Sequence, residues 1–204
     1  MRLRIEGLHL AYPGEPALVA NWSAVIGPGV SELHGDTGSG KTSLLRVLAG
    51  ELPAKGRLTL GDAELGAAPE AYRRQVFYVD PMTDRFHAVT GRDCVAALRA
   101  DDDGFDAARC EDLVQGFGLE PHIDKPLYML STGSRRKVWL AAALASGRAL
   151  TLLDEPTAAL DSGSVRCLWQ ALADIAARRA RVVVVASSER LEGLPLAASW
   201  VLPL

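Results

Sequence analysis

Residues 33–50, LHGDTGSGKTSLLRVLAG, limit the possible folds of this chain more than any other stretch. The segment GVSELHG reads as a short strand that enters the glycine-rich turn, and apolar residues from Leu44 to Leu48 follow at helical spacing. Residues 35–42 match the pattern GxxxxGK[ST], in which backbone N–H groups surround a phosphate at a helix N-terminus. The strand before and the helix after favour a nucleotide site over an ordinary glycine turn.

The chemistry of this loop predicts the role of each residue in it. We expect the Lys41 ammonium to reach the terminal phosphates and the Thr42 hydroxyl to ligate Mg²⁺. The residues expected to bind the nucleotide phosphates are Gly35, Asp36, Thr37, Gly38, Ser39, Gly40, Lys41, Thr42 and Ser43.

A second candidate group is the run ALTLLDEP, residues 149–156. Asp154 ends an apolar strand, from which its carboxylate can reach a Mg²⁺ ion held by Thr42. Glu155 would then face the γ-phosphate and polarise the attacking water. An Asp-Glu pair at a strand end is often only a solvated turn or a helix cap, but a phosphate loop in the same chain favours the catalytic interpretation.

The order of the predicted elements indicates an α/β fold. The apolar runs ALTLLD and RVVVVAS read as strands buried on both faces, with the helical pattern VRCLWQALADIAARRA between them, as in a parallel sheet. The chain opens with alternating strands of antiparallel type. We therefore expect one domain over residues 1–204: a P-loop NTPase (RecA-like) core, an N-terminal antiparallel β subdomain and an inserted helical subdomain at about 81–130.

Composition limits the other function classes. The net charge of −3 argues against a basic surface that binds nucleic acid, so no nucleic-acid partner is expected. Cys94, Cys110 and Cys167 match neither a metal site nor a disulfide framework. No apolar run reaches the roughly 18 residues of a membrane span, and the N-terminus lacks a signal-peptide core, so we expect a soluble cytoplasmic chain.

The stretch LSTGSRRKVWLAAALASG, residues 130–147, resembles the LSGGQ signature of ATP-binding cassette (ABC) ATPases. The order of phosphate loop, signature, LLDEP and TAALD is that family's order, over nearly the whole chain. By this resemblance Tyr12 would stack on adenine and Asp161 would be the D-loop aspartate. Ser131 is placed to N-cap a helix, so its hydroxyl and the N–H groups near Gly133 form a second anion site.

The resemblance also implies the cofactors and partners. ATP and Mg²⁺ would lie between the phosphate loop of one subunit and the signature of the other in a head-to-tail dimer. That dimer would be a homodimer or a heterodimer with another ABC ATPase. It would dock, at the inner face of the cell membrane, onto a separate transmembrane transporter subunit through the groove beside residues 80–130. Short single-domain haem-export ATPases of cytochrome c maturation are similar in length.

The chain departs from the family pattern within the signature, where Thr132 and Ser134 replace the usual first glycine and glutamine, and at two positions near the phosphates. Where the family places a Mg²⁺-contacting glutamine, this chain has Asp80, which can still ligate the metal but donates no amide hydrogen bond. Where the family places its switch histidine, the chain has Ser187, which is the candidate catalytic residue at that position. Loss of one preorganised donor costs about 10²–10³ in rate, so slow hydrolysis is expected.

These departures leave two hypotheses open. The first is the ATP-hydrolysing subunit of a membrane transporter. The second is an ATP-dependent dimerising switch, or a degenerate heterodimer partner with little hydrolysis, which Asp80 and Ser187 favour and the intact Glu155 opposes. Repair-type ABC ATPases need long coiled-coil insertions that this chain lacks.

Overall fold

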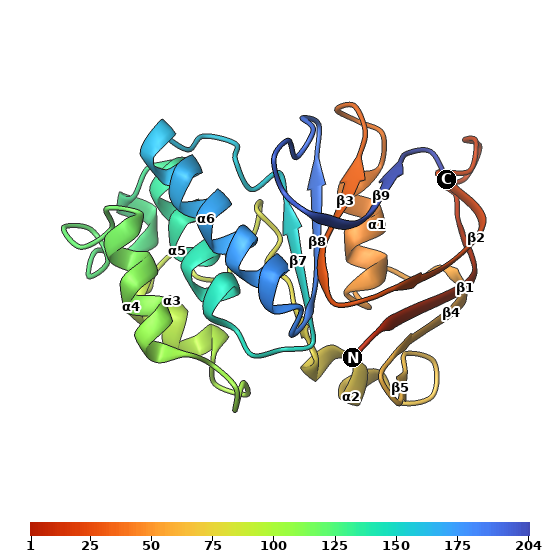
Figure 1. The fold of residues 1–204 in the computed structure, drawn as a ribbon, viewed down its shortest axis with the longest axis horizontal. Coiled ribbons are helices and arrows are strands. Elements are labelled where there is room, and N and C mark those ends of the chain that lie inside the picture. Colours follow the sequence, from red (N-terminus) through yellow and green to blue (C-terminus); the bar gives the residue numbers. More distant parts are fainter.

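The computed structural model describes residues 1–204 as two sheets with helices between and beside them (Figure 1). The antiparallel sheet has the order β2-β1-β4-β5, formed by Leu3–Leu10 (β1), Val19–Ile26 (β2), Lys55–Leu60 (β4) and Ala63–Glu64 (β5). The parallel sheet has the order β6-β7-β8-β3-β9, formed by Gly29–His34 (β3), Val76–Phe77 (β6), Leu150–Asp154 (β7), Val182–Ser187 (β8) and Leu196–Val201 (β9). The expected α/β fold with an antiparallel and a parallel sheet is confirmed.

Six α-helices connect these strands. They are Lys41–Leu48 (α1), Pro69–Arg74 (α2), Gly91–Leu98 (α3), Ala107–Gly116 (α4), Thr132–Ala145 (α5) and Ser162–Arg178 (α6), with a short 3-10 turn at Leu127–Met129. No helix has both the length and the apolar character needed to cross a membrane.

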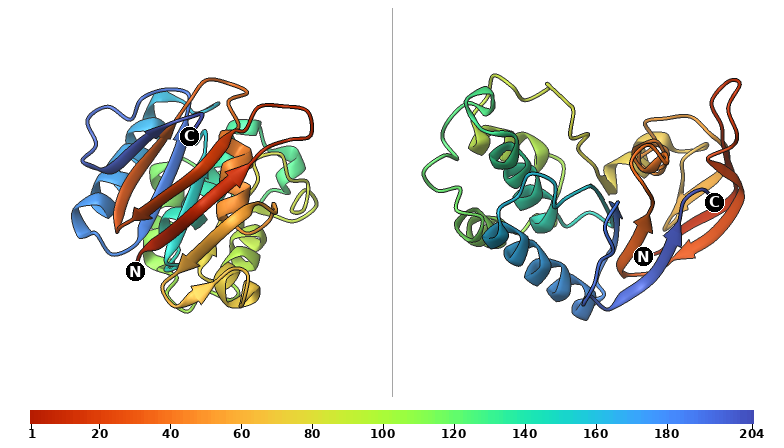
Figure 2. Two further views of the ribbon diagram at one scale, coloured as in Figure 1. Left: turned by 90° about the vertical axis from the view of Figure 1, so that its right-hand side faces the viewer. Right: turned by 90° about the horizontal axis from the view of Figure 1, so that it is seen from above.

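Two apolar cores lie on opposite faces of the parallel sheet. Leu153, Val183 and Val185 point to a core shared with α4, α5 and α6, whereas Leu152 and Val184 point to a core shared with α1 and the antiparallel sheet. Figure 2 shows the same separation from above, with the helical part on one side of the strands and the antiparallel sheet on the other. The alternation of side chains along each strand therefore separates α1 from α5.

Two local features differ from the pattern in the sequence. RRQVFYV reads as one strand, but Arg73 and Arg74 end α2 and β6 holds only two residues. Pro69 at the first turn, Glu70 near the helix N-terminus and the buried Tyr72 stabilise a helix there. The second difference is the edge strand β9, which pairs with β3 in parallel. Its burial alternates, and no pattern in its sequence indicates the strand with which it pairs.

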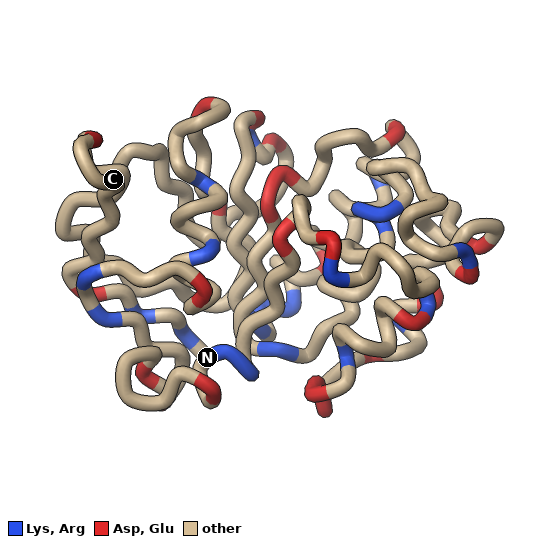
Figure 3. The backbone as a smooth tube through the Cα atoms, turned by 180° about the vertical axis from the view of Figure 1, so that it is seen from behind, with Lys and Arg blue, Asp and Glu red and all other residues tan.

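Charged residues are distributed over the whole molecule (Figure 3). Several basic positions follow the N-terminal strands, next to acidic ones. There Arg57 lies 3.5 Å from Glu6 and 3.6 Å from Glu64. Both pairs are exposed, so each contributes at most about 1 kcal/mol to stability.

Candidate functional site

The phosphate loop lies between β3 and α1 and leaves the N-terminus of α1 open. Helix α1 begins after Gly40, at φ 92°, and no side chain caps it. Helices α3, α4, α5 and α6 each have a side-chain cap, provided by Thr90, Asp106, Ser131 and Asp161. The first N–H groups of α1 are therefore free to bind an anion.

Close packing explains why this loop needs glycines. A Cβ atom added at Gly40 would lie 2.6 Å from Leu18 Cδ1, and one added at Gly35 would lie 2.5 Å from Ser39 Oγ. Side chains at these positions would collide with Leu18 and Ser39. The loop thus has the bare backbone that a phosphate cradle requires.

Lys41 is nearly buried, and its ammonium contacts three oxygen atoms. Its Nζ atom lies 2.6 Å from Gly35 O, 3.0 Å from Asp36 O and 3.1 Å from Glu155 Oε1. These acceptors hold the ammonium beside the open loop, where phosphate oxygens of a nucleotide could replace them. Lys41 and Glu155, predicted from separate motifs, therefore meet in the structure.

Thr42 and Asp154 also meet, as predicted for a Mg²⁺ site. The Thr42 hydroxyl donates to Asp154 Oδ2 at 2.7 Å, while the buried Asp154 Oδ1 has no hydrogen-bond partner. Burial raises the pKa of Asp154; the Thr42 hydrogen bond and Lys41 lower it, and the charges of Glu155 and Asp80 raise it further. A cation would satisfy the unpaired oxygen.

The residues around Asp154 fit a metal ion that binds together with a nucleotide. No three His, Cys, Asp or Glu side chains converge into a metal site of their own. Mg²⁺ at phosphate sites takes only one or two protein ligands and completes its shell with phosphate and water. The pair Thr42 and Asp154 fits that pattern.

Glu155 follows β7 with an unusual backbone conformation. Its φ is 43°, in the left-handed region, and its N–H donates to Ala186 O at 2.9 Å. The carboxylate faces Lys41 on one side and Ser188 on the other, with Ser188 Oγ 3.3 Å from Glu155 Oε2. The carboxylate is thereby directed to the phosphate loop.

Ser187 and Ser188 occupy different environments. Ser187 is buried, and its hydroxyl accepts a hydrogen bond from the Glu189 N–H at 3.0 Å. Ser188 is exposed and contacts the Glu155 carboxylate instead. The catalytic role expected for Ser187 stays a prediction, and Ser188 is the hydroxyl that the structure brings to the site.

Tyr12 and Asp80 lie at the margins of the same site. The Tyr12 hydroxyl is 2.8 Å from Ser43 Oγ, which brings the ring to the first turn of α1. Asp80 Oδ1 accepts from the Met82 N–H at 2.9 Å and so stabilises a turn. Its charge acts on Asp154, but its role as a metal ligand stays a prediction.

The signature residues form a second group. Ser131 is the N-cap of α5 and accepts from the Ser134 N–H at 3.1 Å. A Cβ atom at Gly133 would overlap Ala159 O, so the helix start packs directly on the loop after β7. Asp161 caps α6 and pairs with Lys137 at 2.6 Å, and the Lys137 hydrogen bond contributes most to lowering its pKa.

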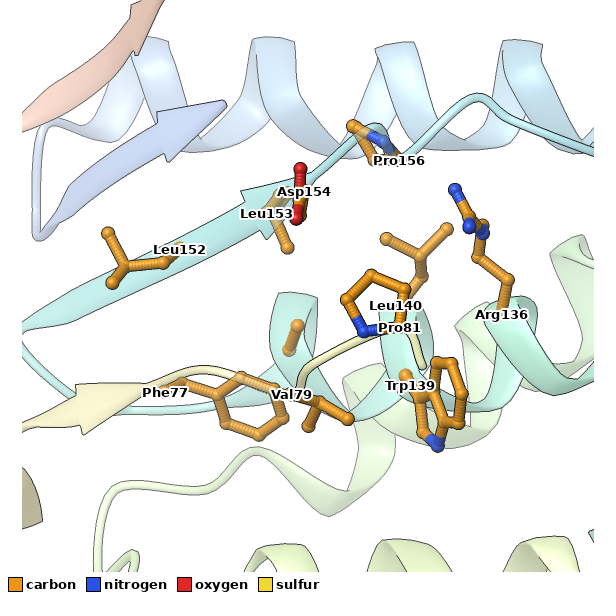
Figure 4. A pocket seen from close by; sticks show the side chains of 11 residues that line it. Phe77, Val79, Pro81, Arg136, Trp139, Leu140, Leu152, Leu153, Asp154 and Pro156 are labelled. Carbon is orange, nitrogen blue, oxygen red and sulfur yellow. The ribbon is translucent and has the colours of Figure 1, made fainter. Parts of the chain in front are cut away.

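Arg136 is a site residue that the motifs did not single out. Its Nη1 atom donates to the backbone oxygen of Glu155. A small, mostly apolar pocket lies beside it, lined by Val79, Pro81, Trp139 and Asp154 among others (Figure 4). No spacing rule pointed to this contact, because it depends on how α5 packs against β7.

Comparison with known proteins agrees with this geometry. Residues 27–158 match the family model of the ABC transporter. The chain is 38% identical over 177 residues to the cytochrome c biogenesis ATP-binding export protein CcmA of Rhodospirillum rubrum, covering 86% of this chain and 76% of that protein. It is 32% identical to the zinc import ATP-binding protein ZnuC of Halorhodospira halophila, covering 92% of this chain and 68% of that protein.

A solved structure has the same fold. The chain superposes on a putative ABC transporter ATP-binding protein from Pyrococcus furiosus with a TM-score of 0.77, covering 98% of this chain and 97% of that one at 22% identity. The chain therefore belongs to the ABC transporter family, as an ATP-binding subunit of the kind whose members are ATPases coupled to transport.

Proposed function

We propose that this chain binds ATP with Mg²⁺ on the Lys41 loop, closes as a dimer and hydrolyses the nucleotide to drive a separate membrane subunit. The observation that carries the proposal is the set of contacts among four side chains. Thr42 bonds Asp154, Lys41 contacts Glu155, and both pairs lie at the carboxyl end of the parallel strands. This end is where ligands bind in such sheets.

The proposed roles follow from the contacts. The N–H groups of the loop and the Lys41 ammonium would bind the phosphates, and Tyr12 would lie against the base. Thr42 and Asp154 would hold Mg²⁺, which supplies positive charge to the phosphate oxygens when bound. Glu155 would accept a proton from the attacking water once the nucleotide displaces its carboxylate from Lys41.

The two anion sites of one chain support the dimer. Ser131 and Gly133 start α5 on one side of the parallel sheet, whereas α1 packs on the other. A second copy in a head-to-tail arrangement would bring its signature over this Lys41 loop. Each copy carries both halves, so two copies would complete two sites around a two-fold axis.

An exposed apolar surface supports docking to the membrane subunit. Met82, Val89, Tyr128 and Met129 are exposed at 87%, 38%, 62% and 59%. The segment with Val89 lies beside the segment with Tyr128 and Met129, because the Tyr128 N–H donates to His87 O at 3.0 Å. Exposed apolar patches of this kind mark protein contacts. We propose that the partner binds there and that the chain lies at the inner face of the membrane.

A dimerising switch with little hydrolysis is the second candidate. It is favoured by Asp80, whose charge adds to those of Asp154 and Glu155, and by the absence of an imidazole at Ser187 and Ser188. A degenerate partner of a heterodimer would share these features.

ATP hydrolysis by the purified protein decides between the two candidates. We expect Mg²⁺-dependent release of phosphate that Glu155→Gln lowers by about 10²-fold or more, as for loss of a general base. Glu120→Gln, at an exposed carboxylate, is the matched control and should keep the wild-type rate. Hydrolysis that is equal in wild type and Glu155→Gln would contradict the proposal and would favour the dimerising switch.

A further inference from the structure

The second turn of α5 contacts the backbone of the proposed catalytic carboxylate. Arg136 Nη1 donates to Glu155 O. Figure 4 shows the Arg136 side chain extending from α5 toward Pro156 and the end of β7, next to Trp139 and Leu140. None of the roles proposed above uses this guanidinium.

The contact of Arg136 falls on a strained part of the backbone. A non-glycine residue at φ 43° is strained, and a following proline also disfavours this conformation. Pro156 has no N–H with which to stabilise the turn. The Glu155 N–H donates to Ala186 O at 2.9 Å, and the Glu155 carbonyl accepts from the Ala158 N–H at 3.1 Å within the turn. Arg136 is the side chain that adds a second donor to this carbonyl and so connects the turn to α5.

Stability alone does not explain the position of Arg136. Its side chain is half-buried, and its buried Nε atom has no hydrogen-bond partner. Burial lowers the pKa of Arg136, and the charges of Asp154 and Glu155 raise it. An unpaired buried donor lowers the stability of the fold, so the contact of Arg136 with Glu155 O carries a cost.

The first two turns of α5 also hold the rest of the loop after β7. Gly133 packs on Ala159 O, and Lys137 pairs with Asp161. With Arg136, these contacts attach the loop to α5 from Glu155 to Asp161. Ser131, which begins this helix, is the residue proposed to face the ATP of the second subunit.

We propose that Arg136 is a positioning residue that fixes the Glu155 backbone, so that the carboxylate faces Lys41 and moves with α5. This inference rests on the proposed function and deepens it. When Ser131 binds the ATP of the second subunit, a movement of α5 would therefore move Glu155 beside the ATP of its own subunit.

Arg136→Gln and Arg136→Lys test the proposal in the purified protein. We expect Arg136→Gln to lower kcat by about 10–10²-fold, as for a misplaced catalytic group, with KM for ATP within about twofold of wild type. Arg136→Lys keeps the charge and one donor and should be intermediate. Arg135→Gln is the matched control, because its guanidinium faces His87 at 3.2 Å, and it should match wild type.

Hydrogen exchange gives a second readout that does not depend on activity. In Arg136→Gln, the amides of residues 153–160 should exchange faster, with the phosphate loop and the melting temperature little changed. Arg136→Lys should show a smaller effect and Arg135→Gln none. Wild-type exchange and kcat in Arg136→Gln, equal losses in Arg135→Gln, or a rise in KM alone would overturn the inference. A wild-type protein that hydrolyses no ATP would overturn the proposed function, while the exchange result would still decide on Arg136.

Discussion

Two consecutive serines at the end of β8 show how side-chain direction determines which residue can act. Ser187 is only 2% exposed and uses its hydroxyl to cap the turn at Glu189. Ser188, one residue later, contacts the Glu155 carboxylate at 3.3 Å. A donor at position 188 would therefore reach the reacting phosphate side, whereas one at position 187 would be enclosed.

Substitution of each serine by histidine should have a different effect, on the hydrolysis rate at position 188 and on stability at position 187. Ser188→His should raise kcat by about tenfold or more, since one preorganised donor is worth about 10²–10³ in rate. Ser187→His should lower stability by about 1–3 kcal/mol through overpacking. ATPase rates and thermal unfolding of both variants, with Ser188→Ala as control, make the comparison. Faster hydrolysis in Ser187→His alone would contradict this account and show that position 187 is equivalent to the family's switch histidine.

At the scale of elements, a buried carboxylate connects β3, β9 and the segment after β8. Glu32 on β3 is 2% exposed and accepts from Leu191 N at 2.7 Å, Ser199 Oγ at 2.7 Å and Arg190 Nη1 at 2.8 Å. Burial raises the pKa of Glu32, but these hydrogen bonds and the Arg190 charge outweigh it and lower the pKa. The loop that follows Ser188 is therefore anchored to the strand that leads into the phosphate loop.

The lowered pKa of Glu32 predicts a pH dependence of stability. The folded state prefers the carboxylate, so the stabilisation is complete above the unfolded pKa of about 4.3 and is lost as pH falls through the lower folded pKa. In Glu32→Gln this part of the acid decline should be absent, with a cost of about 1–3 kcal/mol at pH 7. Urea unfolding between pH 7 and 3 measures both effects.

Glu6→Gln is the control for the acid decline, because Glu6 is exposed beside Arg57. It should retain the wild-type slope. An unchanged slope in Glu32→Gln would show that Glu32 contributes no charge-dependent stability.

The sequence predicted those elements whose patterns are local. The phosphate loop, the apolar strands β7 and β8 and the cap at Ser131 each follow from a few neighbouring residues. The pairing of β9 with β3 depends on contacts between distant segments, as does the contact of Arg136 with Glu155. Burial of Ser187 rather than Ser188 also depends on tertiary packing, which single-residue patterns do not contain.

At the scale of the whole molecule, the two apolar cores lie on opposite faces of the parallel sheet. The Lys41 loop and α1 belong to the face shared with the antiparallel sheet, and the signature helix α5 belongs to the other core. Figure 2 shows, in the view from above, the helical part and the antiparallel sheet on opposite sides of the parallel strands. This division gives a physical reason for closure by a second subunit, because ATP would join surfaces that one chain keeps apart.

The mass of the Glu155→Gln protein with ATP and Mg²⁺, measured by light scattering, tests the central claim most directly. We predict a dimer with ATP, a monomer without it, and a monomer with greatly reduced ATP affinity when Lys41→Ala is added. A Glu155→Gln protein that is saturated with ATP yet stays monomeric, or a Lys41→Ala variant with unchanged ATP affinity, would contradict the account.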